Sequence, residues 1–232
     1  MYTNGRAQEP SARETVYAKL KEQILNLELP PGTALSEKES SLVLGVSRTP
    51  VRESFVRLAQ EGLVQVLPQR GTFVSLIDPA LVEEARFMRE HLERAVVRLA
   101  CAHFPDGHLH ALEDNLALQL KSIEREDDRR LFELDEAYHR ILFDGCGKLN
   151  TWRAIGQMNV HLNRSRMLRL VADRHWQHLY EQHETIFKAV KDGDADRAER
   201  VMQEHLLLGV RDLAHLMDKY PQYFVSGGDG KP

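Results

Sequence analysis

Residues 45–60, Gly-Val-Ser-Arg-Thr-Pro-Val-Arg-Glu-Ser-Phe-Val-Arg-Leu-Ala-Gln, predict a short amphipathic helix. Ser47 is a residue type favoured at a helix N-cap, and Pro50 lies in the first turn, where its missing N–H costs little. One face of the helix is apolar at helical spacing, with Val51, Phe55, Leu58 and Ala59. This face is expected to pack against the rest of a small domain.

The other face of the same helix begins with Arg48, Thr49 and Arg52. These side chains suit phosphate contacts and bidentate recognition of guanine in a DNA major groove. Two arginines on a helix are, however, most often a solvated charged surface. The flanking sequence decides between the two interpretations.

Upstream of this stretch the sequence predicts two more helices. Ser11-Ala-Arg-Glu14 is a capping box that opens a helix reaching about Leu29, and Pro30-Pro-Gly32 ends it. Ser36-Glu-Lys-Glu39 is a second capping box, and Gly45 is expected to close that helix in a left-handed conformation. A short turn then leads into the third helix, which is the spacing of a helix-turn-helix.

Downstream, two β-rich runs follow Gly62. Residues 63–67 and 72–76 are joined by Pro68-Gln-Arg-Gly71, which predicts a hairpin. Three helices and a terminal hairpin predict a winged helix-turn-helix over residues 11–77. Arg70 is then at the tip of the wing, where it can contact a phosphate or the minor groove.

From residue 79 to about residue 219 the sequence predicts helices throughout. Six segments are expected, near 79–103, 107–125, 128–144, 149–170, 174–192 and 194–219. They predict an all-α bundle as a second domain, which agrees with a length of 232 residues. The glycine-rich residues 220–232 are expected to form a mobile tail.

The composition is typical of a soluble globular protein, with 42% hydrophobic and 28% charged residues. No apolar run reaches the length of about 18 residues that spans a membrane, and residues 1–10 lack the apolar core of a secretory signal. We therefore expect a cytoplasmic protein without membrane contacts. Cys101 and Cys146 are expected to be buried free thiols rather than a disulfide.

The net charge of −4 does not by itself indicate a nucleic-acid-binding protein. Residues 1–77 contain nine Lys and Arg against eight Asp and Glu, for a net charge of +1. The remainder contains 22 against 27, for a net charge of −5. This distribution is compatible with a small local basic surface in the first domain.

Four polar residues of the helical domain could converge on a metal ion. Asp135 and His139 leave one helix face one turn apart, and His183 and His205 lie in the middle of the last two helices. Such a set suits zinc, nickel, manganese or iron. From spacing alone the commoner alternative stands, which is that these are ordinary core or surface histidines. The other eight are taken as structural or solvated: His91, His103, His108, His110, His161, His175, His178 and His215.

Arg89 lies on a partly apolar face of the first bundle helix and could bind the carboxylate of a small organic acid. An intrahelical salt bridge to Glu93, four residues on, is an equally good interpretation, and both can hold together. Asn159 and Asn163 could add hydrogen bonds to such a ligand.

Several motifs together resemble the winged-helix domain of the GntR transcription regulators. They are Leu35-Ser-Glu37, Gly45-Val-Ser-Arg-Thr-Pro-Val-Arg-Glu53, Leu58-Ala-Gln-Glu-Gly-Leu63 and Arg70-Gly-Thr-Phe-Val74. The helical remainder is similar to the FCD ligand-binding domain of the FadR branch, over residues 79–219. The sequence differs from the usual family pattern at two pairs of packing positions. It has Ser40-Ser41 in place of Leu-Ala, and Ser54-Phe55 in place of Ala-Leu.

The resemblance implies a fold, a function and site residues. The fold is mainly α, a winged helix-turn-helix followed by an FCD-type bundle. The operator contacts it implies are Lys38, Ser47, Arg48, Thr49, Arg52, Arg70 and Gly71. It also favours a metal at Asp135, His139, His183 and His205, because many FCD domains have Asp-x-x-x-His and two later histidines.

The resemblance thus predicts a homodimeric repressor, not an enzyme, that leaves a pseudo-palindromic operator when a small organic acid binds at the metal. Zinc, nickel or manganese is the expected ion, and Arg89 and Asn159 are the expected effector contacts. Two alternatives stay open at this point: a metalloenzyme that uses the Asp/His₃ set, and a metal-free ligand-binding regulator.

Overall fold

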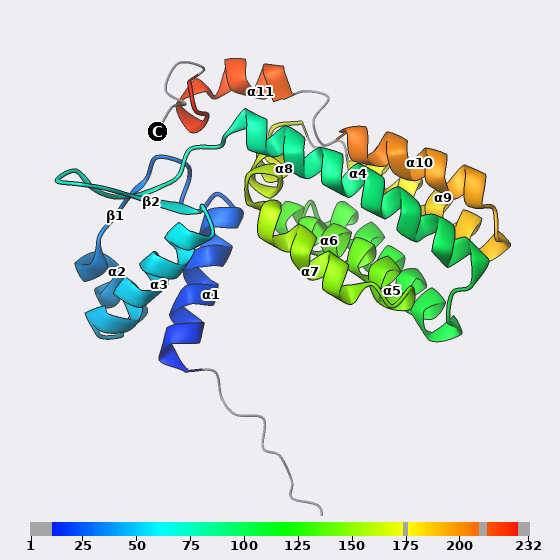
Figure 1. The fold of residues 1–232 in the computed structure, drawn as a ribbon, viewed down its shortest axis with the longest axis horizontal. Helices are drawn as coiled ribbons and strands as arrows, with labels where there is room; N and C mark the ends of the chain where they lie inside the picture. Colours follow the sequence, from blue (N-terminus) through cyan, green and yellow to red (C-terminus); the bar gives the residue numbers. More distant parts are fainter. Residues whose placement is uncertain (1–10, 174–175, 209–212, 227–232) are drawn as a thin grey trace, which may run out of the picture. The chain divides into compact units, whose positions relative to one another are not determined.

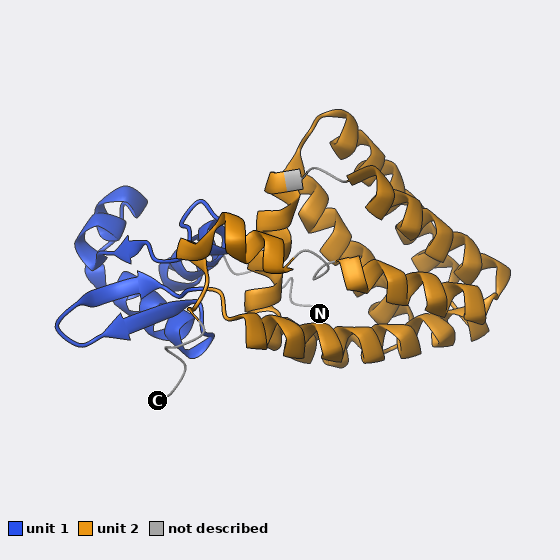
Figure 2. Cartoon of the chain, turned by 90° about the horizontal axis from the view of Figure 1, so that it is seen from above, with its two compact units in different colours: residues 1–76 blue, residues 77–232 orange. Residues whose placement is uncertain are grey.

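The computed structural model describes residues 11–173, 176–208 and 213–226. It forms two compact units, residues 1–76 and 77–232 (Figure 2). The expected tail residues 227–232 and His175 lie outside the described residues.

The first unit contains three helices and a small sheet (Figure 1). The helices are α1 (Ala12–Leu25), α2 (Glu37–Leu44) and α3 (Arg48–Gln60), and the strands are β1 (Ala34–Leu35), β2 (Val64–Leu67) and β3 (Gly71–Val74). The sheet is antiparallel in the order β1-β3-β2, with Val64 opposite Val74 in the hairpin. The predicted hairpin is therefore confirmed. The sequence did not predict β1, because two residues are too few to show an alternating pattern.

The helix ends agree with the predicted caps in most respects. Ser11 and Glu14 form both bonds of a capping box, and Gly45 closes α2 in the left-handed conformation at φ 65°. Ser36 accepts a bond from the Glu39 N–H at 3.4 Å. The first helix ends earlier than expected, at Leu25, because Leu27 adopts a φ of 61°.

Ser47 occupies the N-cap of α3, but its side chain makes no capping bond. The third residue of this helix is Pro50, which has no N–H to donate to the Ser47 hydroxyl. The expected capping bond is therefore absent, and the exposed hydroxyl stays available to a partner outside the helix.

The apolar face of α3 packs as predicted. Val51, Phe55 and Leu58 are buried, and they share the core of the unit with α1. Ser41 and Ser54, which stand at unusual positions, are also buried. Each satisfies its hydroxyl with a backbone carbonyl of its own helix, Lys38 O at 2.8 Å and Pro50 O at 2.7 Å. Burial of the two serines therefore reduces the stability of the α2–α3 pair only slightly.

The second unit is helical in all its major elements. Its helices are α4 (Pro79–Ala102), α5 (Asp106–Glu124), α6 (Asp128–Gly145), α7 (Leu149–Met158), α8 (Val160–Asp173), α9 (Trp176–Asp192), α10 (Ala195–Leu208) and α11 (Leu213–Lys219), followed by the 3₁₀ turn η1 (Pro221–Tyr223). The fourth predicted segment is two helices that meet at Asn159, and the last one is α10 and α11. No proline marks the break at Asn159, so the residue pattern alone did not predict it.

The core of this unit lies between α4, α5, α6, α9 and α10. Figure 1 shows α4 running beside α10, and these two helices make the most extensive contact between elements in the described part of the chain. Val97, Tyr138, Leu142 and Ile186 are all fully buried there. This core holds α6, α9 and α10 in place, and these helices carry the four predicted metal ligands.

The last described residues pack against the beginning of the helical unit instead of forming a mobile tail from residue 220. Phe224 is buried and forms a parallel bridge with Ile77, the first residue of the unit. The predicted tail at residue 220 therefore begins at least five residues too early. Two features of the sequence indicate ordered structure here and were missed. They are Pro221, at the start of η1, and the apolar residue Phe224.

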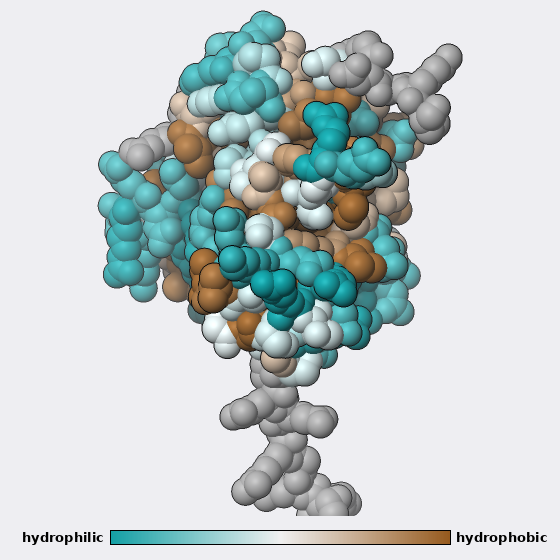
Figure 3. Space-filling model, turned by 90° about the vertical axis from the view of Figure 1, so that its left-hand side faces the viewer, coloured by the Kyte–Doolittle hydropathy of each residue, from teal (hydrophilic) through white to brown (hydrophobic). Residues whose placement is uncertain are grey.

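The surface carries scattered apolar side chains. On the face shown in Figure 3 they form separate patches between hydrophilic ones. Among the described helices, none is long and apolar enough to cross a membrane. Cys101 and Cys146 are free thiols as predicted, although both are half-buried rather than buried.

Candidate functional site

The residues expected to contact DNA all lie on the surface of the first unit. All seven are exposed: Lys38, Ser47, Arg48, Thr49, Arg52, Arg70 and Gly71. Lys38 is in the first turn of α2, the next four are at the beginning of α3, and the last two are at the β2–β3 turn. Exposure leaves them accessible to phosphates and base edges, and their contact with DNA stays a prediction.

Arg52 forms the clearest polar contact of this surface. Its Nε and Nη2 donate to the two carboxylate oxygens of Glu37 at 3.0 and 3.1 Å. This bond raises the pKa of Arg52 and ties the first turn of α2 to α3. Because the arginine side chain is 69% exposed, its bond to Glu37 is screened by water. A DNA phosphate or guanine can therefore replace Glu37 at small cost.

In the second unit, the four predicted metal ligands lie together. Their ligand atoms are within 4.8 Å of one another, and all four residues are buried. His205 Nε2 is 3.1 Å from His139 Nε2 and 3.3 Å from His183 Nε2. Asp135 Oδ1 is 3.7 Å from His183 Nε2 and 3.8 Å from His205 Nε2. Ligands at about 2.1 Å from one ion are about 3.0–3.5 Å apart, so this spacing is close to that of a coordination sphere.

The proton of His183 is placed by a chain of hydrogen bonds that begins at a backbone carbonyl. Leu134 O accepts from Asn115 Nδ2 at 3.0 Å, and Asn115 Oδ1 accepts from Gln119 Nε2 at 2.6 Å. This leaves Gln119 Oε1 facing His183 Nδ1 at 2.9 Å. An amide oxygen only accepts, so Nδ1 carries the hydrogen and Nε2 carries the lone pair.

The other two histidines are oriented in the same way. His205 Nδ1 faces Gln182 Oε1 at 3.2 Å, and His139 Nδ1 contacts the carboxylate of Glu93. The Nε2 atoms of all three imidazoles therefore face one point beside Asp135. Facing lone pairs repel one another unless they share a cation, and outer partners of this kind are typical of metal-bound histidines.

Burial and nearby charges fix the ionisation of the cluster. Burial lowers the pKa of His183 to about 3, and burial with the neighbouring His183 lowers the pKa of His205 well below its usual value. Burial alone would raise the pKa of Asp135, but Arg166 and the imidazoles hold it far below its usual range. At neutral pH His183 and His205 are neutral and Asp135 is ionised, the states that bind metals.

A cavity opens beside Asp135 and His205. The space inside it that a water-sized sphere can occupy is about 40 Å³, and its empty space rises to about 530 Å³ when the open mouth is counted. Its polar lining is strongly cationic, with Arg86, Arg89, Arg166 and Arg169, and its apolar lining is Leu162, Leu170, Leu179 and Leu206. Guanidinium groups around an apolar cavity suit a small molecule with a carboxylate.

Arg89 is 1% exposed and lines this cavity, and its binding of a carboxylate ligand stays a prediction. Its Nε donates to Glu93, as in the expected intrahelical salt bridge, and its Nη1 donates to Glu136 at 3.2 Å. Its Nη2 is buried without a hydrogen-bond partner among the described residues. Burial disfavours the charge, but Glu93 and Glu136 keep the pKa of Arg89 above its usual value. The guanidinium is thus charged and has one free donor for a ligand.

Asn159 does not line this cavity. It lies at the break between α7 and α8, it is 1% exposed, and neither atom of its amide has a partner among the described residues. Asn163 accepts from Arg166 Nη1 at 3.3 Å, so it supports an arginine of the cavity. The role of Asn159 in effector binding stays a prediction.

Sequence reasoning missed the residues that orient the four ligands. Glu93, Gln119 and Gln182 hold the imidazoles, and Arg166 holds Asp135. One signal was visible for Gln119, because Asn115 and Gln119 are four residues apart on the face of Leu112 and Leu116. Polar pairs on an apolar helix face need partners inside the protein.

Most of the remaining histidines lie where they were expected. His108 is half-buried, and the exposed ones are His91, His103, His110, His178 and His215. His161 has the structural role that was one of the two expected for these histidines. It is 7% exposed and bonds to the backbone of Asp78.

Comparison with known proteins identifies the class of protein. Residues 12–74 match the model for bacterial regulatory proteins of the gntR family, and residues 84–208 match the FCD domain. The chain belongs to the gntR family. This result confirms the resemblance and places the chain with DNA-binding transcription regulators rather than with enzymes, so the metalloenzyme alternative is set aside.

Two curated proteins are similar to this gntR-family chain over most of its length. An uncharacterised HTH-type transcriptional regulator of Streptomyces ambofaciens is 40% identical over 97% of this chain and 92% of its own length. The HTH-type transcriptional repressor RspR of Escherichia coli K12 is 37% identical over 83% of this chain and 85% of its own length. Among solved structures, E. coli McbR/YncC has a TM-score of 0.75 at 23% identity, with 91% of this chain and 99% of that chain covered, and shows the same fold.

Proposed function

We propose that this gntR-family regulator is a repressor whose DNA binding is controlled by a metal-dependent organic-acid site in the helical unit. The observation that carries the proposal is the convergence of three imidazole Nε2 atoms and the Asp135 carboxylate beside an arginine-lined cavity. The similarity to proteins named as repressors, RspR and NanR of Edwardsiella tarda, supports the direction of control.

Asp135, His139, His183 and His205 would hold the ion. The donor set of three imidazoles and one carboxylate suits zinc, nickel or manganese. When bound, such an ion supplies a positive charge and open coordination positions for the oxygens of a ligand. The residues of this chain do the rest: Glu93, Gln119 and Gln182 orient the imidazoles, and Arg166 holds the second carboxylate oxygen of Asp135.

The effector of this site is a small organic acid, such as a sugar acid or another hydroxy-carboxylate. Arg89 Nη2 offers it a buried unpartnered donor, and Arg86, Arg166 and Arg169 surround the same cavity with positive charge. The leucines of the lining exclude water from one side of the ligand and so strengthen these contacts. Asn159 is proposed as an additional contact of the effector.

On the DNA side, we assign residues 11–77 to the DNA-binding domain and 79–219 to the effector and dimerisation domain. The chain acts in the cytoplasm as a homodimer that binds both halves of a pseudo-palindromic operator, about one DNA turn apart. Arg48, Thr49 and Arg52 contact base edges and phosphates in the major groove, and Arg70 contacts the DNA from the wing. Lys38, Ser47 and Gly71 contact the DNA backbone.

The proposal is tested with protein purified without a chelator. Elemental analysis should find about one transition metal per chain in the wild type and in His215→Ala, an exposed histidine, but none in His205→Ala. A duplex selected from a random pool by the wild type is then bound with and without sugar acids and other carboxylates. Release of the duplex by an acid in the wild type but not in His205→Ala is the expected result.

Two results would contradict this proposal. Wild-type protein without metal that still responds to an acid would favour a metal-free regulator. A duplex affinity that no acid of the panel alters, in a chain loaded with metal, would remove the assigned effector class.

A further inference from the structure

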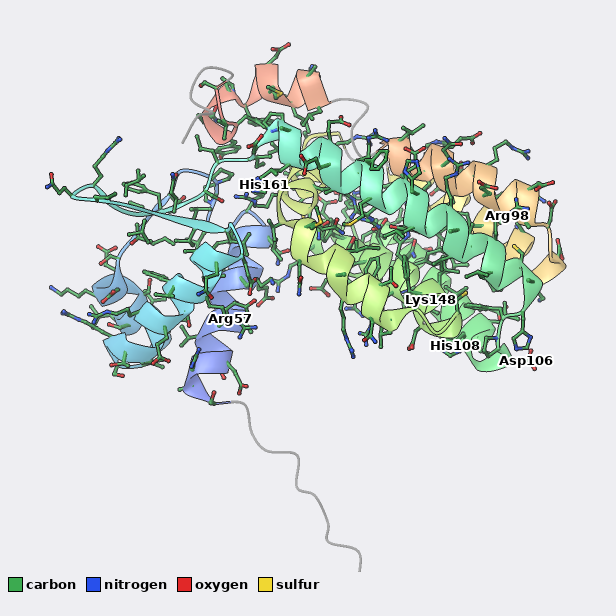
Figure 4. The ribbon with its side chains drawn as sticks, in the orientation of Figure 1. Arg57, Arg98, Asp106, His108, Lys148 and His161 are labelled. Carbon is green, nitrogen blue, oxygen red and sulfur yellow. The ribbon has the colours of Figure 1, made fainter. Side chains whose placement is uncertain are left out.

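His161, on α8, accepts a hydrogen bond from the backbone at the beginning of the helical unit. Its Nδ1 is 3.0 Å from the backbone nitrogen of Asp78, which is the N-cap of α4. Figure 4 labels His161 beside the first turn of α4. Leu76 ends the first unit, so Asp78 is the second residue of the helical unit after the chain enters it.

The protonation of His161 is fixed by its neighbours. Arg164 Nη2 lies 3.2 Å from the same Nδ1, and both this group and the Asp78 N–H are donors. Nδ1 must therefore be an acceptor, and the imidazole hydrogen is on Nε2. Burial and the charge of Arg164 lower the pKa of His161 to about 4. The imidazole is thus neutral at physiological pH, and the bond to Asp78 persists.

The residue before Asp78 is held as well. The Ile77 N–H donates to Tyr223 O at 2.8 Å, and the Val225 N–H donates to Ile77 O at 2.9 Å. The first two backbone N–H groups of the helical unit are therefore both bonded within that unit. Ile77 is fixed by the C-terminal segment, and Asp78 is fixed by α8.

The same helix, α8, also contacts the candidate metal site. Arg166 donates to Asp135 and Glu136 on α6, and Arg169 donates to Leu208 O at the end of α10. Arg166 follows His161 by five residues, which is about 7.5 Å along a helix axis. A helical segment of this length moves as one body, because each residue is hydrogen-bonded to the next turn. A shift at Arg166 therefore reaches His161.

We propose that α8 transmits the occupancy of the Asp135 site to the Asp78 backbone through the hydrogen bond from Asp78 to His161. His161 is then a positioning residue for the regulatory response, and this inference rests on the proposed function. The physical cause lies at Asp135, whose carboxylate pairs with Arg166 and faces His183 and His205. A cation bound to Asp135 weakens its pair with Arg166, so α8 takes a new position against α6.

The test uses the full-length chain, Zn²⁺ alone as the probe, and three variants. His161→Leu removes the acceptor. His161→Asn keeps one, because the asparagine oxygen lies close to the position of imidazole Nδ1. His178→Leu replaces an exposed histidine on α9 and is the matched control. Hydrogen exchange of the Asp78 amide is measured by mass spectrometry with and without Zn²⁺, on fragments that separate it from the Ile77 amide, and Pro79 on its other side has no amide hydrogen.

We expect Zn²⁺ to change the exchange rate of the Asp78 amide by about fivefold or more in the wild type, His161→Asn and His178→Leu. In His161→Leu the amide should exchange rapidly with and without Zn²⁺, for a ratio of about one. All four proteins should bind the same amount of Zn²⁺. Circular dichroism and thermal unfolding show whether each variant is folded.

The outcomes separate this inference from the proposed function. If the wild type binds no Zn²⁺, the proposed metal site and this inference are both overturned. If the wild type binds Zn²⁺ but the exchange of Asp78 does not change, only this inference is overturned. The same conclusion follows if folded His161→Leu keeps the wild-type response to Zn²⁺. Loss of the response in His161→Asn as well would show that the acceptor is not the essential feature.

Discussion

Two arginine–glutamate pairs with similar chemistry show how differently the two candidate sites are built. Arg52 pairs with Glu37 on the surface, where the arginine side chain is 69% exposed. Arg89 pairs with Glu93 in the helical unit, where the two side chains are 2% and 1% exposed. The first pair can exchange its partner for DNA because water screens it. Loss of Arg89 from the second pair would leave the buried carboxylate of Glu93 with only its contact to the His139 imidazole, and so without an arginine to balance its charge.

The largest expected effect comes from breaking the buried pair. Arg89→Met leaves Glu93 buried without its main partner, and we expect a loss of about 3–5 kcal/mol in the free energy of unfolding. Urea unfolding followed by circular dichroism measures it. Arg52→Met is the matched control, and its unfolding curve should stay close to that of the wild type. Equal losses in both variants would mean that the contrast in burial does not control stability.

A second test in the helical unit concerns the buried imidazole of His161 and uses pH. The folded protein lowers the pKa of His161 from 6.5 to about 4, so between these values the unfolded chain binds a proton that the folded chain excludes. This contribution to stability is therefore lost as the pH falls from 6.5 to 4, up to about 3 kcal/mol. The difference in unfolding free energy between wild type and His161→Asn should change by that amount. His215→Asn, at an exposed position, should follow the wild-type curve.

The hydrogen-bond chain behind His183 predicts a third effect. Gln119→Leu removes the acceptor of His183 Nδ1, so the imidazole can rotate or change tautomer. Loss of such a partner lowers metal affinity by about 10–100-fold. Competition with a chromogenic chelator measures it. Gln177→Leu, which alters an exposed glutamine on α9, should keep wild-type affinity. Equal affinity in both variants would show that the buried amide does not orient His183.

The contrast between the sites also explains what the sequence could predict. The winged unit depends on local signals, such as the Ser11 capping box, the left-handed Gly45 and the hairpin turn, and each was visible. The four candidate ligands were selected by spacing and resemblance, and the structure brings their side chains together.

The features that could not be predicted from the sequence depend on contacts between distant segments. Gln119 and His183 are 64 residues apart, and Arg166 and Asp135 are 31 apart, so no periodic pattern links them. The break at Asn159 and the bond between Asp78 and His161 are of the same kind, since each is set by packing against another helix. The missing cap at Ser47, in contrast, could have been predicted from the sequence. Pro50 is the third residue of α3 and has no N–H for the Ser47 hydroxyl to accept from.

On the exposed side, Arg52→Ala should weaken binding to the selected duplex by roughly tenfold to a hundredfold, because it removes a proposed base contact. Metal content should stay at the wild-type value, since Arg52 lies in the other unit. Fluorescence anisotropy and elemental analysis measure the two quantities on one preparation. Arg57→Ala, which alters an exposed arginine later on α3, is the matched control. Similar losses from both would indicate a general charge effect rather than a specific contact.

The smallest expected effect is that of a single phosphate contact from the wing. Arg70→Ala should weaken binding to all duplexes to a similar extent and reduce the slope of log affinity against log salt by about one. Arg200→Ala removes an equal charge from an exposed position on α10 and should leave the slope unchanged. A loss of sequence preference in Arg70→Ala would instead place this side chain at a base edge. An unchanged slope would remove the wing tip from the DNA-contacting surface, while the contacts proposed for α3 would stand.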